Sequence, residues 1–353
     1  MLDVTRAALA PHTTLRLGGP ARRLVVASFP DEILQIVRDG DRAGDPPLIL
    51  AGGSNVVVSD DGVPGPVLLL RTSGITMAAA GDGEVLVTVE AGQDWDEVVA
   101  VTVAEGLVGI ECLSGVPGSA GATPIQNVGA YGQEVGQTIA GVRVYDRTRR
   151  EVLDMSPAGC RFAYRSSVFR HNDRYVVLGV TFRLRRDGLS APVRYAELAR
   201  RLDVAVGTRV PLDEVRSAVL ALRAGKGMVL DPADPDTYSV GSFFINPVLT
   251  AAGYAPMRAR ALEVTGEEPA TWPAGADVKV SAAWLIERAG FVKGYGGGHP
   301  GVAISSKHSL ALTNRGTGTT AALLALAREI RDGVAKTFEV ELHPEPVLIG
   351  CAL

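Results

Sequence analysis

Cysteine and net charge are both scarce in this chain of 353 residues, and each scarcity excludes a class of protein. The three cysteines, Cys112, Cys160 and Cys351, are scattered and form no C-x-x-C pair. A disulfide framework and a structural zinc site are therefore not expected, and a reducing compartment is indicated. The net charge is only −4, so the whole chain is not expected to bind nucleic acid or an anionic membrane. Any anion site must be built from a few local cations.

Long apolar runs are also absent from the sequence. No stretch approaches the roughly eighteen apolar residues that a membrane span needs. Residues 1–15 have neither a basic start nor a continuous apolar core, which argues against a secretory signal. We therefore expect a cytoplasmic protein without a membrane partner. Hydrophobic residues still make up 46% of the chain, and this length predicts two or three domains.

Alternating and helical patterns predict an α+β fold. Strands are expected at 24–27, 47–50, 67–70, 84–90, 142–145, 151–153 and 175–184. Helices are expected at 31–39, from Asp94 through Val103, from Pro211 to about Arg223, at 281–289 and at 319–336. Residues 225–238 are predicted to be extended, and the tail 338–349 to return to strand character. The predicted domains are a small α+β unit (1–71), a mostly antiparallel unit (72–225), an α/β domain (226–336) and a C-terminal return segment (337–353).

The most distinctive stretch is PGSAGATPIQNVGAYG, residues 117–132. Its small residues leave backbone amides accessible to a polyanionic ligand, and Gln126 and Asn127 add side-chain hydrogen bonds. It matches neither the G-x-G-x-x-G fingerprint nor a P-loop. A second small-residue turn, AGGSN (51–55), follows an apolar run. The two turns predict a cradle for the phosphates of one long ligand, with a glycine-rich surface loop as the alternative.

Three residues are candidates for chemistry. Ser242 lies between a glycine and two phenylalanines in GSFFINP, where its hydroxyl can donate a proton in a water-poor setting. Arg165 lies in FAYRSS, and Glu345 lies between prolines that fix the backbone around it. A surface salt bridge is the alternative for both Arg165 and Glu345. Ser242 is not in a G-x-S-x-G elbow and the five histidines form no motif, so a hydrolase is disfavoured.

Taken together, GGSN, PGSAGATPIQNVGAYG, FAYRSS, GSFFINP and PEP, in this order and spacing, resemble the UDP-N-acetylenolpyruvoylglucosamine reductases over nearly the whole chain. The segment PVRYAEL (192–198) resembles the tyrosine-bearing loop of the family's type I members. The resemblance implies a two-subdomain FAD-binding domain of the vanillyl-alcohol-oxidase and p-cresol-methylhydroxylase type, over 1–71 and 72–225. A C-terminal α/β substrate-binding domain is implied over 226–336.

The implied activity is a UDP-N-acetylmuramate dehydrogenase of peptidoglycan precursor synthesis, and hence a role in cell-wall biogenesis, cell shape and division. NADPH would reduce FAD, and the reduced flavin would then convert UDP-N-acetylglucosamine enolpyruvate to UDP-N-acetylmuramate. FAD is expected to be non-covalent, because neither phosphate turn contains histidine or cysteine. The expected partner is this small-molecule substrate, with no nucleic acid, no membrane and no metal. We expect a monomer.

The resemblance also assigns site residues. Arg165 and Glu345 correspond to the pair that polarises the substrate, and Ser242 corresponds to the proton donor. The FAD positions are Gly52, Gly53, Ser54, Asn55, Gly118, Ser119, Gly121, Ala122 and Arg223. The substrate positions are Tyr131, Tyr195, Lys226, Asn246, Trp272, Lys279 and His308.

Four positions depart from the family pattern. Ile245 replaces a common lysine, Trp272 a tyrosine that meets the uridine, His308 a polar amide and Pro346 a valine. An indole can still stack on a base, so the uridine pocket is expected to persist. Two rival functions remain open: an oxidase of the same fold, which would react with oxygen, and a nucleotide-sugar binding protein without chemistry.

Overall fold

The computed structural model describes residues 2–353, and their contacts divide into two compact units. Unit 1 comprises the segment ending at Ala7, Ala21–Gly53 and Pro64–Val229, and unit 2 comprises Ala8–Pro20, Ser54–Val63 and Leu230–Leu353. The ranges expected from the sequence follow chain order, whereas each unit joins segments that are far apart in the chain. Two N-terminal segments belong to unit 2 because they bond to its late residues. The Thr14 hydroxyl, for example, donates to the Ser239 carbonyl (2.6 Å).

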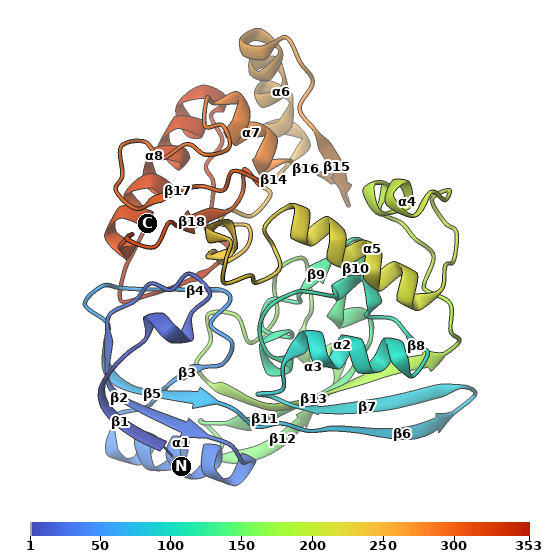
Figure 1. Ribbon diagram of the computed structural model, residues 1–353, viewed down its shortest axis with the longest axis vertical. Helices are drawn as coiled ribbons and strands as arrows, with labels where there is room; N and C mark the ends of the chain where they lie inside the picture. The colour runs from blue at the N-terminus through green and yellow to red at the C-terminus, as the bar shows by residue number, and fades with distance from the viewer. Residues whose placement is uncertain (1) are drawn as a thin grey trace. The chain divides into compact units, whose positions relative to one another are not determined.

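Unit 1 contains a small sheet and a large sheet, both drawn in Figure 1. The small sheet has the order β1-β2-β5-β3. Its strands and the helix packed on it are β1 (Leu2–Ala8), β2 (Pro20–Ala27), β5 (Val63–Leu70), β3 (Leu48–Leu50) and α1 (Pro30–Ala43). The large sheet has the order β12-β11-β13-β7-β6, with β8 also pairing with β13. Its strands are β12 (Glu151–Met155), β11 (Ile139–Asp146), β13 (Tyr175–Arg186), β7 (Glu84–Glu90), β6 (Ile75–Gly81) and β8 (Leu107–Val108).

The remaining elements of unit 1 are mostly helices. They are α2 (Trp95–Ala104), α3 (Pro157–Cys160), α4 (Ala196–Leu202), α5 (Leu212–Gly225) and the short hairpin β9 (Gly129–Ala130) and β10 (Gln133–Glu134). The large sheet pairs antiparallel throughout its described ladders, as expected. Helix α2 begins where the sequence predicts, because the Asp94 carboxylate accepts the backbone N–H of Glu97 (3.0 Å). Its Trp95 packs on Phe182 of β13, with ring centroids 5.5 Å apart.

Unit 2 is built from short strands and three longer helical segments. Its elements are β4 (Val56–Val58), β14 (Val248–Leu249), α6 (Ala251–Thr265), β15 (Thr271–Ala274), β16 (Asp277–Val280), α7 (Ala282–Arg288), β17 (Val302–Ile304), β18 (Leu312–Asn314), α8 (Thr320–Phe338) and β19 (Val347–Ile349). Helix α8 buries a stripe that includes Leu323, Ala327, Ile330 and Val334, at the spacing of one helix face. Strand β19, in the C-terminal segment, pairs in parallel with β4.

Two predictions of secondary structure were wrong, and one helix was not predicted. Helix α6 was not expected, because Pro256 reads as a helix breaker and α6 buries little besides Met257 and Ala261. The tail forms a regular strand only at β19, because the described residues before it pair only at the isolated bridge of Pro344 with Phe244. Residues 225–238 are folded on themselves around a 3₁₀ turn (Pro235–Thr237) rather than extended. The α+β class itself is confirmed. Within residues 2–353 no helix combines the length and the apolar character that crossing a membrane requires.

Candidate active site

The glycine-rich stretch 117–132, the central loop of unit 1, packs closely against neighbouring segments at its glycines. A Cβ added at Gly52 would lie 2.5 Å from the Cα of Gly118, which puts the two small-residue turns in direct contact. A Cβ at Gly121 would lie 2.6 Å from the Cβ of Ala91. The N–H of Gly121 also donates to the Ala91 carbonyl (2.9 Å), at the end of β7. Larger residues at these positions would push the turns apart, so the sequence pattern GG…GSAG has a steric cause.

Two buried polar atoms beside this loop lack a protein partner. Among the described residues, the hydroxyl of Ser119 and the Nε of Arg223 have no hydrogen-bond partner, although both atoms are buried. The Arg223 Nε lies 3.5 Å from the position of a Cβ at Gly115, just before the loop. Burial lowers the pKa of Arg223, with Tyr131 and Asp96 opposing the shift. Buried donors are normally satisfied, so an acceptor group is missing here.

Helix α5 carries Arg223 and is fixed in position by a second arginine. Arg216 makes a two-pronged ion pair with Asp96 of α2, with N–O distances of 2.7 and 2.8 Å. The Asp96 carboxylate also accepts the N–H of Gly115 (2.6 Å). Although burial opposes it, these contacts lower the pKa of Asp96, so the carboxylate stays ionised. The Asp96 carboxylate therefore holds both helix α5, through Arg216, and the residue Gly115 just before the central loop.

Arg165 lies at the tip of a tight turn in unit 1. Ala163 and Ser166 pair with each other across the turn, and Arg165 has a left-handed backbone (φ 49°). Its Nη2 donates to the carbonyl of Gly129 (3.0 Å) in the central loop. The amide of Asn127 donates to the Ala163 carbonyl (3.1 Å) and so ties the turn to the loop. The predicted catalytic arginine is thus positioned by the predicted phosphate loop.

Tyr131, Tyr195 and Lys226 come together in unit 1. The two tyrosine rings meet edge to face with centroids 5.4 Å apart, and the Lys226 ammonium lies 5.8 Å from the centroid of the Tyr131 ring. Lys226 also forms an ion pair with Glu197 (2.6 Å), the second residue of α4. Burial raises the pKa of Tyr131 to about 12, so its phenol is a hydrogen-bond donor at neutral pH.

Ser242 and Glu345 lie on paired segments of unit 2. Phe244 and Pro344 form an antiparallel bridge, and the N–H of Glu345 donates to the carbonyl of Phe243 (2.8 Å). This register places Glu345 opposite Phe243, the residue that follows Ser242. The departure at Ile245 does not interrupt the pairing, because its N–H donates to the His343 carbonyl (3.0 Å).

The second half of the GGSN turn falls in unit 2, where it bonds to the chain close after Glu345. The carbonyl of Asn55 accepts the N–H of Val347 (3.0 Å), two residues beyond Glu345. Pro346 precedes this bond and leaves it intact. Of the four predicted residues of the turn, Gly52 and Gly53 therefore belong to unit 1, and Ser54 and Asn55 to unit 2.

The other predicted substrate residues are also in unit 2. Trp272 of β15 is directly opposite Lys279 of β16, so the indole and the cation share one face of the hairpin. The side-chain Oδ1 of Asn246 accepts the N–H of Ala282 (2.9 Å) at the start of α7, so this side chain also has a structural role. His308 accepts the N–H of Leu310 at Nδ1 (3.2 Å), which places the proton of a neutral ring on Nε2.

Two further residues contact the predicted site residues or their loop but were not identified from the sequence motifs: Gln133 and Glu197. Gln133 is buried, its Oε1 accepts the N–H of Cys112 (2.8 Å), and its Nε2 has no partner among the residues described. It follows GAYG directly, so its position was a signal that could have been used. Glu197 is adjacent in sequence to the PVRYAEL tyrosine, but only the fold reveals its pairing with Lys226.

Comparison with known proteins identifies related families and proteins. Residues 21–155 match an FAD-binding domain, and residues 232–349 match the C-terminal domain of UDP-N-acetylenolpyruvoylglucosamine reductase. The chain is 60% identical to the UDP-N-acetylenolpyruvoylglucosamine reductase of Salinispora arenicola, covering 98% of this chain and 95% of that protein. It is 57% identical to the enzyme of the same name from Thermobifida fusca, covering 98% and 97%.

A solved structure shares the fold. The crystal structure of UDP-N-acetylenolpyruvylglucosamine reductase from Thermus caldophilus matches with a TM-score of 0.65 and 23% identity. The match covers 99% of this chain and 98% of that one. The shared fold extends over both units of the chain.

Proposed function

The chain belongs to the UDP-N-acetylenolpyruvoylglucosamine reductase family, and on that premise we propose how its residues share the reaction. The resemblance read from the motifs is confirmed. The protein is an FAD-dependent oxidoreductase that reduces UDP-N-acetylglucosamine enolpyruvate to UDP-N-acetylmuramate for peptidoglycan precursor synthesis. We further propose NADPH as the hydride donor, a non-covalent flavin, a monomeric state and a cytoplasmic location.

The residues of unit 1 fit FAD on structural grounds. The cradle at Gly52 and Gly118 has no room for a Cβ, and the buried Ser119 hydroxyl and Arg223 Nε both need an acceptor. We assign the FAD diphosphate to the two turns, including Gly53, Ser54, Asn55, Gly121 and Ala122, and the flavin ring to Arg223. When bound, FAD supplies the carrier that passes a hydride from NADPH to the enolpyruvyl alkene.

Arg165 and Glu345 stabilise the charge that develops on the substrate. Hydride addition pushes electrons towards a carboxylate that is already negative, so positive charge and donors must be in place beforehand. Arg165 meets this need because Gly129 fixes its guanidinium. Glu345 acts in protonated form or through a bound water. A donor of this kind lowers the barrier by about 3 kcal/mol.

Ser242 donates the proton that completes the reduction. The observation that carries this role is the backbone pairing of the serine segment with the Glu345 segment, which fixes the two in register. A serine hydroxyl is a weak acid, so it serves only where geometry is fixed and the carbon it protonates is strongly basic.

Two lysines, two tyrosines and an indole bind the rest of the substrate. Lys226 and Lys279 neutralise the UDP diphosphate, and the protonated phenols of Tyr131 and Tyr195 donate to it. Trp272 is exposed beside Lys279, which suits stacking on the uracil ring. Asn246 and His308 contribute donors at the same substrate.

A stopped-flow experiment tests the assignment of Ser242. The flavin is reduced anaerobically with NADPH, and the substrate is then added while the yellow absorbance is followed. Ser242→Ala should be reduced at the wild-type rate and reoxidised by substrate about 10²- to 10⁴-fold more slowly. Ser73→Ala, an exposed serine of unit 1, is the control and should behave as wild type.

Other outcomes would separate the rival functions. Equal loss in both half-reactions would contradict the role of Ser242. Wild-type flavin that NADPH bleaches and only oxygen restores would favour the oxidase. A protein whose flavin NADPH does not reduce would favour a binding protein.

A further inference from the structure

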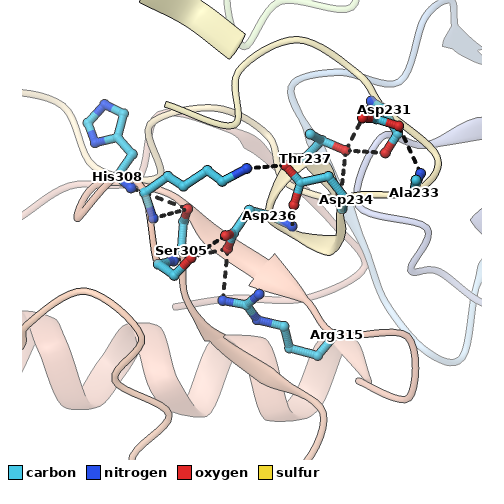
Figure 2. A network of polar contacts seen from close by, with 10 residues as sticks. Asp231, Ala233, Asp234, Asp236, Thr237, Ser305, His308 and Arg315 are labelled. Atoms are coloured by element: carbon cyan, nitrogen blue, oxygen red, sulfur yellow. Dashed lines mark hydrogen bonds and ion pairs between the residues drawn. The ribbon is translucent and has the colours of Figure 1, made fainter. Parts of the chain in front are cut away.

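The acidic segment 231–237 and the turn 305–311 form a polar network in unit 2 that the roles above leave unused (Figure 2). Hydrogen bonds within the acidic segment hold its backbone. The Asp231 carboxylate accepts the N–H of Ala233 (2.9 Å), and the Asp234 carboxylate accepts the N–H of Asp236 (3.0 Å). The Thr237 hydroxyl donates to the Asp234 carbonyl (2.8 Å). The segment is therefore held by its own hydrogen bonds, although its regular structure is limited to the 3₁₀ turn Pro235–Thr237.

Asp236 joins this segment to the turn between β17 and β18. One carboxylate oxygen accepts the N–H of Ser306 (3.0 Å) and pairs with the Arg315 guanidinium (2.8 Å), and the other accepts the Ser306 hydroxyl. The side chain is almost fully buried, at 4% exposure. Burial raises the pKa of Asp236, but the hydrogen bonds from Ser306 and the charge of Arg315 outweigh it, so the pKa lies below its ordinary value. The buried group is thus an ionised carboxylate with several donors.

The 305–311 turn also pairs with the segment that contains Ser242. Ser242 forms an antiparallel bridge with Ala311, and the N–H of Phe243 donates to the carbonyl of Leu310 (2.7 Å). The turn closes on itself where the N–H of Ser305 donates to the Ala311 carbonyl (2.8 Å). A displacement of the turn therefore moves the backbone at Ser242.

We propose that Asp236 is a positioning residue for the reduction step: through the 305–311 turn it fixes the backbone of Ser242. The inference rests on the role of Ser242 proposed above. Asp236 has no proton-transfer task; it keeps the hydroxyl of another residue in place. Because His308 is on the same turn, the carboxylate also orients a predicted substrate contact.

The test is the substitution Asp236→Asn, which keeps the shape and removes the charge that meets Arg315 and Ser306. With FAD-loaded enzyme, reduction by NADPH should stay within about twofold of wild type. Reoxidation by substrate should slow about 10- to 100-fold, the loss expected from a misplacement of about 1 Å. The solvent deuterium isotope effect on reoxidation should rise, because proton donation becomes slower. Asp231→Asn is the matched control, since the new amide oxygen still accepts the N–H of Ala233.

A second variant keeps the proposal testable if Asp236→Asn folds poorly. Ser306→Ala removes one donor to the carboxylate and leaves every charge in place, so it should show a smaller slowing of the same half-reaction. The double variant should be less impaired than the product of the two single effects, because both act through one contact. Wild-type reoxidation in Asp236→Asn, beside a slow Ser242→Ala, would overturn the positioning role alone. Equal slowing of both half-reactions would also overturn it, and a normal Ser242→Ala would instead refute the proposed function.

Discussion

The substitution Gly52→Ala tests whether the two small-residue turns hold FAD. The new Cβ would lie 2.5 Å from the Cα and 3.0 Å from the carbonyl carbon of Gly118. Carbon atoms ordinarily approach to about 3.5–4.0 Å, so one turn must move by about 1 Å. Both obstructing atoms are backbone, and no flexible side chain can yield. Overpacking of this kind costs about 1–3 kcal/mol, which corresponds to about 5- to 150-fold weaker FAD binding if the displaced turn carries the contact.

The measurement is a titration of the apoprotein with FAD, followed by the quenching of flavin fluorescence. Gly159→Ala is the matched control in unit 1, because its Cβ would meet only the Ser156 hydroxyl oxygen at 3.6 Å and a Met155 carbon at 3.8 Å. It should bind FAD as wild type does. If Gly52→Ala also binds FAD with wild-type affinity, the contact between the turns is structural only and the cradle lies elsewhere.

Two further predictions concern buried polar groups of unit 1. Ser119→Ala should leave the melting temperature of the apoprotein unchanged, because the buried hydroxyl has no partner among the described residues. The same substitution should weaken FAD binding by about 1 kcal/mol, or about fivefold. A lower melting temperature of the apoprotein would contradict this prediction. The hydrogen bonds of Arg174 lower the pKa of the buried Asp146 carboxyl to about 2. Its contribution to stability is therefore complete above the unfolded pKa near 4 and is lost as the pH falls towards about 2. The gap in melting temperature between wild type and Asp146→Asn should shrink over that interval in a pH series, and a gap that stays constant would refute the assignment.

Local signals in the sequence predicted much of the secondary structure. Asp94 began α2 as expected because a capping carboxylate works within one helical turn. The helix at 251–265 was missed because Pro256 is a local signal that the surrounding structure overrides. The C-terminal strand was overextended because, in the part of the chain that the structure describes, the residues between α8 and β19 pair only at the isolated bridge of Pro344 with Phe244.

The site was predicted from motifs, and its geometry was not. Nothing in the sequence gives the register that pairs the Phe243 and Glu345 segments, because that register depends on contacts between distant parts of the chain. That the buried Ser119 hydroxyl has no hydrogen-bond partner among the described residues is likewise seen only when every neighbouring group has been placed. Asp236 looked like one acid in an acidic loop, and only its burial against Ser306 and Arg315 sets it apart.

The interleaving of the two units affects the order in which the chain can fold during synthesis. Strand β4 is made early, but its parallel partner β19 lies far downstream in the chain. Until then β4 has an unpaired edge, and pairing across so long a separation is slow because loop closure must come first. Unit 1 has all its segments once Val229 is made, whereas unit 2 also needs Leu230–Leu353. A nascent chain arrested before Pro344 therefore carries the Ser242 segment without Pro344 and Glu345, the residues that pair with it.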